Sequence, residues 1–233
     1  MISVLVPIYN GFEFINDSVT SIINQTYTDW ELIIGINGHP ENSKIYNDTI
    51  NYINSLTTQA STTQTLKEKI HILDLFTINN KSDALNEMIK HTRDDYKWIA
   101  LLDVDDIWRP NKLEIQSKYM EDYDVIGTQC IYFGERLNGI IPRIPLNNIT
   151  EFNFKLTNPI INSSVLIRKE YCYWDKKWIV EDYDLWIRLQ KQNKRFFNCK
   201  EILVKHRIHN QSAFNSKGNS LSVEDLLKFH YKS

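Results

Sequence analysis

Three carboxylates fall within four residues of the chain, at Asp103, Asp105 and Asp106. They follow a short apolar run, 98–102, that is typical of a buried strand. Because like charges this close repel one another, placing them at the end of a buried strand requires a compensating cation. Carboxylate oxygens favour Mg²⁺ or Mn²⁺, which usually keep waters and bridge to substrate phosphates. The cluster therefore predicts a divalent-metal site; the alternative is an acidic turn before a helix that begins near Pro110.

Polar residues also follow three other predicted strands, at the point where each strand ends. The triplet 9–11 (Tyr-Asn-Gly) follows the first strand, the pair 37–38 (Asn-Gly) the second and the triplet 79–81 (Asn-Asn-Lys) the third. In an open parallel sheet, ligands bind beyond the carboxyl ends of the strands. Four separate segments are therefore expected to bring polar groups to one crevice, which indicates a ligand site more strongly than any single motif.

The elements that would position these groups alternate along the first half of the chain. Apolar runs typical of strands are separated by segments whose apolar residues recur at helical spacing. This alternation implies parallel β-α units with right-handed crossovers. It predicts an α/β fold with an open, mostly parallel sheet flanked by helices. Strands are expected at 2–7, 30–36, 69–75 and 98–102, and helices at 12–25, 43–56, 81–91 and from Pro110 to about Met120.

The second half of the chain is less regular. Segment 135–159 contains three prolines and is expected to lack regular structure, and the polar tract 57–65 is expected to form a mobile loop. An amphipathic pattern at 222–230 predicts a helix that packs on the rest of the domain, with self-association as the alternative. Short strands are expected at 123–128, 130–134, 160–168, 195–198 and 202–207, with a helix at 182–192.

Composition argues against several classes of protein. The 233 residues carry a net charge of -2, which gives no electrostatic case for binding nucleic acid or an anionic membrane. The cysteines are widely spaced and match no metal-ligand pattern, so reduced thiols and the cytosol are expected. The apolar run 2–8 is too short for a signal sequence, and no stretch reaches the roughly 20 apolar residues that span a bilayer. The prediction is a cytoplasmic protein without a transmembrane segment.

Several motifs resemble those of family 2 glycosyltransferases, in the same order and at suitable spacing. The resemblance covers about residues 2–212, and ordered motifs are more specific than any single one. In chain order the motifs are 4–11 (Val-Leu-Val-Pro-Ile-Tyr-Asn-Gly), 21–27 (Ser-Ile-Ile-Asn-Gln-Thr-Tyr), 30–34 (Trp-Glu-Leu-Ile-Ile), 84–86 (Ala-Leu-Asn), 102–110 (Leu-Asp-Val-Asp-Asp-Ile-Trp-Arg-Pro), the acidic motif 181–188 (Glu-Asp-Tyr-Asp-Leu-Trp-Ile-Arg) and the closing Arg-x-His-x-x-Ser signature within 206–212.

The resemblance implies a single GT-A domain over 1–233, with a nucleotide-sugar-binding half at about 1–109 and an acceptor half at about 110–233. It implies inverting transfer from a nucleotide-sugar, with UDP-sugars favoured and GDP- or dTDP-sugars open, to a hydroxyl of a glycan or glycoconjugate. A divalent metal, Mn²⁺ or Mg²⁺, would be bound by Asp106 and Asp105, with a contribution from His209. The residues implied to bind the nucleotide or donor are Pro7, Tyr9, Asn10, Asn37, Lys81, Asp103, Asp105, Trp108 and Arg207.

The same resemblance implies that Asp182 is the general base that removes the proton of the acceptor hydroxyl, with Glu181 as the second candidate. The alternative is that both carboxylates only favour the positive end of the helix that they begin. Tyr9 could likewise cover the sheet edge and Lys81 could be a solvated surface lysine, while Asp103 could hold basic side chains in place. The irregular segment 135–159 is the candidate for the acceptor-side loop.

One residue departs from the family pattern. The family commonly has a second acidic residue after the second strand, where this chain has Asn37. An amide can donate and accept hydrogen bonds, so base recognition is retained in principle, but the donor nucleotide is less defined.

Two other functions compete with the transferase. A nucleotidyltransferase would share the sheet and the carboxylates, but residues 9–12 do not resemble a glycine- and basic-rich phosphate loop. A non-catalytic sugar-nucleotide or glycan-binding module is favoured slightly by Asn37 and disfavoured by the retention of Asp105, Asp106 and Asp182. The oligomeric state is left open.

Overall fold

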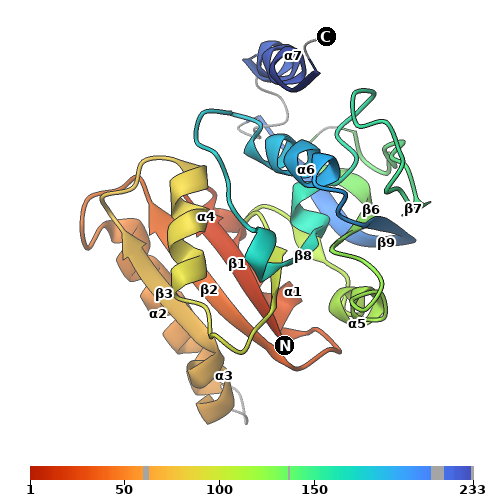
Figure 1. Cartoon of the computed structure of the whole chain (residues 1–233). Helices are drawn as coiled ribbons and strands as arrows, with labels where there is room; N and C mark the ends of the chain where they lie inside the picture. The colour runs from red at the N-terminus through yellow and green to blue at the C-terminus, as the bar shows by residue number, and fades with distance from the viewer. Residues whose placement is uncertain (60–62, 136, 211–217, 232–233) are drawn as a thin grey trace.

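One nine-stranded sheet runs through both halves of the chain in the computed structural model, which describes residues 1–59, 63–135, 137–210 and 218–231 (Figure 1). The strand order is β3-β2-β1-β4-β8-β6-β9-β5, and the short strand β7 pairs with β9. The sheet and the helices that cover it confirm the predicted α/β class.

The first half of the chain forms the parallel part of the sheet. Strands β1, β2 and β4 are buried along nearly their whole length, as expected for parallel strands covered on both faces, whereas the edge strand β3 is buried only at Ile70 and Leu75. The side chain of Asn80 caps the helix that follows β3, because its Oδ1 accepts from the backbone N–H of Asp83 at 2.8 Å. The elements are β1 (Ile2–Ile8), a 3₁₀ turn (Phe12–Phe14), α1 (Ile15–Ile23), β2 (Trp30–Asn37), α2 (Lys44–Gln59), α3 (Thr63–Lys69), β3 (Ile70–Leu75), α4 (Lys81–Lys90) and β4 (Trp98–Leu101).

The second half extends the sheet with mixed pairing. Strand β8 is antiparallel to both β4 and β6, whereas β6 and β9 are parallel to each other. The elements are β5 (Ile107–Trp108), α5 (Lys112–Ser117), β6 (Val125–Gly134), β7 (Asn147–Asn148), a 3₁₀ turn (Asn162–Ser164), β8 (Leu166–Arg168), a 3₁₀ turn (Lys169–Tyr171), α6 (Glu181–Lys191), β9 (Phe196–Ile208) and α7 (Gly218–Tyr231).

Alternate residues of the central strands face two apolar cores, one on each side of the sheet. In β1, Val4 and Val6 belong to one core and Leu5 belongs to the other. In β2, Ile34 and Ile33 are divided in the same way. Because strand side chains alternate between the two faces, both faces of the sheet are buried. Polar groups can reach solvent at the strand ends.

Three sequence-based expectations need correction. The tract 57–65 is not a loop where the structure describes it, because α2 continues to Gln59 and α3 begins at Thr63; residues 60–62 lie outside the described part. The two strands expected at 123–134 are one strand, β6, with an irregular register at Gln129, and those expected at 195–207 are one strand, β9. The strand expected at 160–168 is shortened to Leu166–Arg168, since a 3₁₀ turn takes its first part.

The C-terminal helix α7 packs against α6, as the apolar pattern at 222–230 predicted (Figure 1). Leu226 is fully buried in the core that also contains Leu185 and Trp186. The imidazole of His230 donates to Asp184 of α6 at 2.7 Å, and both side chains are buried. Helix α7 therefore supports the helix that carries Glu181 and Asp182 in its first turn. Among the described helices, none combines the length and the apolar character needed to cross a membrane.

Candidate active site

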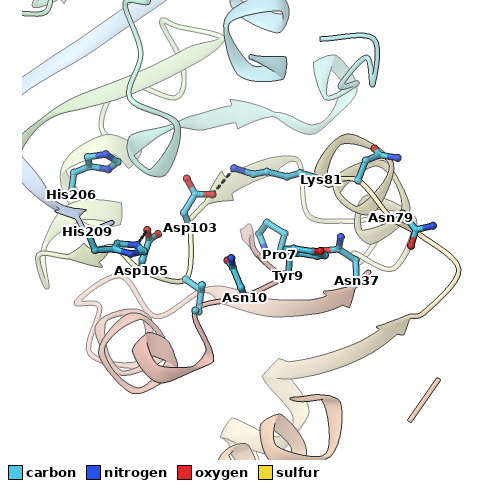
Figure 2. Close-up of a pocket in the computed structure, with 13 residues that line it drawn as sticks. Pro7, Tyr9, Asn10, Asn37, Asn79, Lys81, Asp103, Asp105, His206 and His209 are labelled. Atoms are coloured by element: carbon cyan, nitrogen blue, oxygen red, sulfur yellow. Dashed lines mark hydrogen bonds and ion pairs between the residues drawn. The ribbon is translucent and has the colours of Figure 1, made fainter. Parts of the chain in front are cut away.

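A first cavity of about 420 Å³ lies at the carboxyl ends of β1, β2 and β4 (Figure 2). The turns that follow these strands supply most of its wall, and the end of β9 supplies two histidines. Asn79 and Asn80 also line it, as expected for the triplet that follows the third strand, and so does His206, which the sequence analysis did not place in the site. The predicted site residues that line it are Pro7, Tyr9, Asn10, Asn37, Lys81, Asp103, Asp105 and His209.

The Tyr9 ring forms an exposed aromatic wall of this cavity. It lies against Gly38, where a Cβ atom would come within 2.4 Å of the ring, so that only glycine fits beneath it. The φ of Gly38 is +75°, which also favours glycine. His39 donates a hydrogen bond to the carbonyl of Tyr9, and the two ring centroids are 5.6 Å apart. The ring is therefore held in place while 58% of the residue stays exposed, as a stacking surface for a planar ligand requires.

Asp105 and His209 form a pair of possible metal ligands on the wall of the first cavity (Figure 2). The Oδ2 atom of Asp105 lies 3.0 Å from Nε2 of His209. Burial, followed by repulsion from Asp106 and Asp103, raises the pKa of Asp105, so a cation beside this carboxylate would relieve an existing electrostatic strain.

The donor set fits Mn²⁺ or Mg²⁺ that is completed by substrate. No cluster of three or more His, Cys, Asp or Glu side chains arranged for a metal occurs among the described residues. One carboxylate and one imidazole would leave most of the coordination sphere to water and to phosphate oxygens, which is how Mg²⁺-like ions are commonly held.

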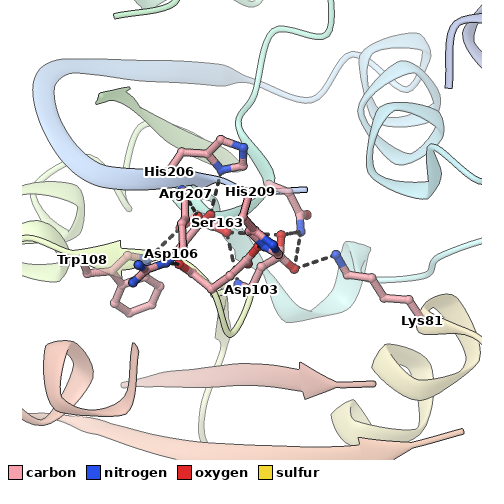
Figure 3. A network of polar contacts seen from close by, with 10 residues as sticks. Lys81, Asp103, Asp106, Trp108, Ser163, His206, Arg207 and His209 are labelled. Carbon is pink, nitrogen blue, oxygen red and sulfur yellow. Dashed lines mark hydrogen bonds and ion pairs between the residues drawn. The ribbon is translucent and has the colours of Figure 1, made fainter. Parts of the chain in front are cut away.

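Asp106 does not line the cavity; it is fully buried behind it (Figure 3). Its Oδ2 accepts from Nδ1 of His206 at 2.9 Å, and its Oδ1 accepts from the backbone N–H of Arg207 at 2.8 Å. Burial alone would lower the pKa of His206, but Asp106 and the neighbouring carboxylates outweigh it and raise the pKa to about 9. The expected metal ligand Asp106 is thus placed to hold a cationic His206 at the cavity wall.

Arg207 and Trp108 also lie away from the cavities, in contrast to their expected contacts with the donor. The Arg207 guanidinium stacks 4.4 Å from the ring centroids of both Phe14 and Phe133, and its Nε donates to the Asp105 carbonyl at 2.8 Å. Trp108 is in the core, where its indole N–H donates to the Ser163 carbonyl at 2.7 Å. The strand and turn around them direct these two side chains inward, so both support the Asp103–Asp106 turn from behind.

Lys81 and Asp103 form an ion pair at the centre of the site (Figures 2 and 3). The Lys81 Nζ is 2.6 Å from Asp103 Oδ1 and 3.6 Å from Glu181 Oε1. Burial would lower the pKa of Lys81, but the carboxylates of Asp103 and Glu181 outweigh it and raise the pKa above its ordinary value. Asp103 also accepts from Asn162 and Ser163. Lys81 is therefore a fixed cation rather than a solvated surface lysine.

A second cavity of about 380 Å³ adjoins the first, and Lys81, Asp103 and His206 line both. Glu181 and Asp182 line the second cavity from the first turn of α6. Burial raises the pKa of Glu181 to about 7 although Lys81 opposes the shift. Burial also raises the pKa of Asp182, against a 3.0 Å hydrogen bond donated by Asn158. Both carboxyl groups are thus more basic than usual, which suits proton abstraction.

Sequence reasoning missed His206, Asn158 and Arg143, which line the second cavity. His206 stands within the closing motif, so its place beside His209 was the available signal. Arg143 and Asn158 come from the irregular segment 135–159, where no periodicity indicates which side chains face a site. Residues 211 and 212 of the closing motif lie outside the described residues.

Comparisons with known proteins match this chain to glycosyltransferases. The sequence model described as Glycosyl transferase family 2 matches residues 3–172. A relative from Escherichia coli, named O-antigen biosynthesis glycosyltransferase WbnJ, is 32% identical over 250 residues, which cover 98% of this chain and 89% of the relative.

Two solved structures share the fold. S. aureus TarS 1–349 in complex with UDP has a TM-score of 0.70 at 14% identity, over 98% of this chain and 64% of that chain. Mannosyltransferase PcManGT from Pyrobaculum calidifontis, in complex with GDP-Man and Mn²⁺, has a TM-score of 0.65 at 12% identity, over 91% of this chain and 58% of that chain. The chain therefore spans less than two thirds of the length of either neighbour.

Proposed function

The chain belongs to glycosyl transferase family 2 and has the GT-A fold, and on that premise we propose that it is an inverting glycosyltransferase that moves a sugar from a nucleotide-sugar to a hydroxyl of a glycan or glycoconjugate. One observation carries the proposal. Two adjoining cavities share Lys81, Asp103 and His206; one contains a candidate metal pair, and the other contains two carboxyl groups of raised pKa. A donor in the first cavity and an acceptor in the second would meet at the shared residues.

The donor is proposed to bind with its base on Tyr9 and its diphosphate toward Asp105, Lys81 and His206. Asn37 is buried at the end of β2 and lines the same cavity, where its amide can both donate to and accept from a base. A UDP-sugar is the first choice, since a neighbour of the same fold is known in complex with UDP. A GDP-sugar is the second, since the other neighbour is in complex with GDP-Man.

Asp105 and His209 are proposed to hold the divalent metal, Mn²⁺ or Mg²⁺. Bound there, the metal would neutralise the charge that develops on the departing diphosphate. Asp106 is proposed to act through His206, which it holds toward both cavities, and through the backbone of Arg207.

Asp182 is proposed as the general base, with Glu181 as the second candidate. Asp182 would take the proton of the acceptor hydroxyl as the acceptor oxygen bonds to the anomeric carbon. The bond from that carbon to the phosphate oxygen would break on the opposite face, so the diphosphate would leave with the bonding electrons and the anomeric configuration would invert. Asn158 holds the Asp182 carboxylate by a 3.0 Å hydrogen bond, which fixes its orientation.

The test is the thermal stabilisation of the protein by nucleoside diphosphates and their sugars, with and without Mn²⁺. We expect one nucleotide to stabilise the protein in a metal-dependent manner, and we expect Asp105→Ala to remove the effect. Asp122→Ala, which changes an exposed carboxylate that lines neither cavity, is the matched control. Slow hydrolysis of the bound donor, lost in Asp182→Asn, would separate an enzyme from a non-catalytic module. If no nucleotide stabilises the protein under either condition, the donor site is wrong.

A further inference from the structure

The prolines of the irregular segment that walls the second cavity share one feature: the carbonyl of each accepts a hydrogen bond from a side-chain amide of the sheet. Gln129 of β6 donates to Pro142 at 3.1 Å. Asn198 of β9 donates to Pro145 at 2.7 Å and to Pro159 at 2.8 Å. Because proline has no backbone N–H, only its carbonyl can take part in such a bond. The segment is therefore fixed to the sheet at three points, although it contains little regular structure.

Asn198 joins two walls of the second cavity through a single amide group. Its side chain is fully buried and lines neither cavity. Pro145 lies two residues after the lining residue Arg143, and Pro159 directly follows the lining residue Asn158. The amide of Asn198 therefore holds both walls at once, and its position fixes how far apart they lie.

The neighbouring strand leaves room for this amide. Gly127 of β6 pairs with Asn198 in the sheet, and a Cβ atom at Gly127 would come within 2.1 Å of Oδ1 of Asn198. Among the described residues, this buried Oδ1 atom has no hydrogen-bond partner. A buried carbonyl oxygen without a partner is unfavourable, and an apolar side chain would avoid that penalty. The two bonds donated by the amide are therefore what distinguishes Asn198 from an ordinary core residue.

One of the two walls carries the contact that orients the candidate base. The side chain of Asn158 donates to Oδ2 of Asp182 at 3.0 Å. We propose that Asn198 is a positioning residue for sugar transfer. Its bond to Pro159 fixes the turn that holds Asn158 against the carboxylate, and its second bond keeps the other wall at the matching distance. This inference rests on the proposed function, because it takes Asp182 as the general base.

A second amide of the same kind serves as the comparison. Gln190 of α6 donates to the carbonyl of Phe152 at 2.6 Å, and so holds the same irregular segment at another point. Phe152 lines neither cavity. Loss of the Gln190 amide removes a similar bond to the same segment, but it leaves the two cavity walls in place. A role in stability alone would make the two amides equivalent, whereas a positioning role is confined to Asn198.

The ionisation of Asp182 reports the position of Asn158 and needs no acceptor. Burial raises the pKa of Asp182, and the hydrogen bond from Asn158 opposes that rise, so loss of the bond raises the pKa further. Carboxyl ¹³C NMR of the full chain labelled at aspartate measures the midpoint, and Asp182→Asn assigns the signal. Asn198→Ala should shift the midpoint to higher pH, and Gln190→Ala should leave it unchanged. The other charged groups that act on this carboxylate remain in both variants: Lys81, Asp103 and Glu181.

Further variants test the route by which Asn198 acts. In Asn158→Ala the midpoint is already raised, so the addition of Asn198→Ala should shift it no further. Asn198→Ser keeps one donor and should give a smaller shift than Asn198→Ala. Gly127→Ala keeps the amide but displaces it, since its Cβ atom would overlap Oδ1, and it should shift the midpoint in the same direction. Thermal unfolding shows which variants are folded, and Gly127→Ala replaces Asn198→Ala if the latter is not.

Hydrolysis of the bound donor measures the catalytic consequence. With a UDP-sugar and Mn²⁺ at pH 7, Asn198→Ala should hydrolyse the donor about 10- to 100-fold more slowly than the unaltered protein, because a small displacement of a catalytic group has an effect of this size. Gln190→Ala should hydrolyse it at the normal rate. The stabilisation of the protein by UDP should be the same in both variants, since neither residue lines the first cavity.

Three results would overturn the inference. An unchanged Asp182 midpoint in Asn198→Ala would show that the amide does not position the base. An equal shift in Gln190→Ala would show that any loosening of the segment has the same effect. Additive shifts of Asn158→Ala and Asn198→Ala would show that Asn198 acts by another route. The NMR midpoint does not depend on activity: if it moves as expected but the unaltered protein binds and hydrolyses no donor, the proposed function is wrong and the positioning of Asp182 stands.

Discussion

The first and second cavities adjoin, yet they are built from different kinds of structure. The first lies at the ends of parallel strands, and its wall consists of short turns whose side chains are largely polar. The second shares Lys81, Asp103 and His206 with the first, but most of its remaining wall comes from segments without long regular elements, around Arg143, around Asn158 and before α6. Strand ends are fixed by the hydrogen bonds of the sheet, whereas irregular segments tolerate change in length and composition. This difference suits a donor site that keeps one geometry and an acceptor site that varies with the substrate.

The largest expected effect comes from a change confined to the second cavity. Asp182→Asn should lower the rate of sugar transfer by about 100- to 10,000-fold, because it removes the proposed general base and keeps the shape of the side chain. The affinity for UDP, measured by calorimetry, should stay the same. A variant that loses UDP binding together with transfer would show that the two cavities are not functionally separate. Asp175→Asn, an acidic residue upstream of α6 that lines neither cavity, is the control.

The second largest effect is expected at Asp106, which holds His206 at the wall that the two cavities share. Asp106→Asn should lower the free energy of unfolding by about 3 kcal/mol, because it removes the fully buried carboxylate that pairs with the partly buried cation of His206. Asp105→Asn should be much less destabilising, since Asp105 already suffers repulsion from its neighbours. Urea denaturation at pH 7 measures both. Equal losses in the two variants would contradict the distinction drawn between these adjacent carboxylates.

A smaller effect is expected at the aromatic wall of the first cavity. Tyr9→Ala should weaken UDP binding about tenfold, because stacking of a base on an aromatic ring contributes about 1–3 kcal/mol. Tyr9→Phe keeps the ring over Gly38 and should bind UDP normally. Calorimetry with UDP and Mn²⁺ gives both values. Unchanged binding in Tyr9→Ala would favour the alternative in which the ring only covers the sheet edge.

The smallest effect is a dependence of stability on pH at the second cavity. Glu181 has an ordinary pKa of 4.5 when unfolded and a pKa of about 7 in the folded protein, so the folded state holds the proton more tightly. Stability is therefore lost as the pH rises from 4.5 through 7. Glu181→Gln removes this loss and should be more stable than the unaltered protein by on the order of 1 kcal/mol at pH 8, with little difference at pH 5.

Thermal unfolding of the two proteins at pH 5 and pH 8 measures this difference. Glu151→Gln, an exposed glutamate, is the control and should show no difference at either pH. A gap between Glu181→Gln and the unaltered protein that is as wide at pH 5 as at pH 8 would show that packing, and not ionisation, sets the effect.

The sequence predicted the first half of the molecule better than the second. Strands β1 to β4 coincide with apolar-rich segments that can be located without tertiary information, and the polar groups at their ends converge as expected. The sequence predicted two short strands in place of β6 and two in place of β9, because polar residues such as Gln129 interrupt the apolar pattern. In the structure, pairing between β6 and β9 keeps each of them a single strand. The tract 57–65 has poor helix formers, yet α2 and α3 extend into it; here the surrounding structure overrides local preference.

Within the site, the sequence identified the right segments but not the direction of every side chain. Asp105 and Asp106 are adjacent, and so are His206 and Arg207; in each pair the first side chain lines a cavity and the second packs away from it. A motif defines which residues are close along the chain, whereas the turn and the strand decide which of them reach the ligand.

Lys81 lines both cavities and lies beside Glu181, so binding of the donor can change the protonation of Glu181 in the second cavity. Its ammonium group stabilises the charged form of Glu181 from 3.6 Å away. A donor diphosphate that attracts this ammonium group would reduce that stabilisation. The pKa of Glu181, which is already about 7, would then rise further. Binding of UDP near neutral pH should therefore take up hydrogen ions from the solution. The calorimetric heat would then change with the ionisation enthalpy of the buffer, and the order in which donor and acceptor bind would depend on pH.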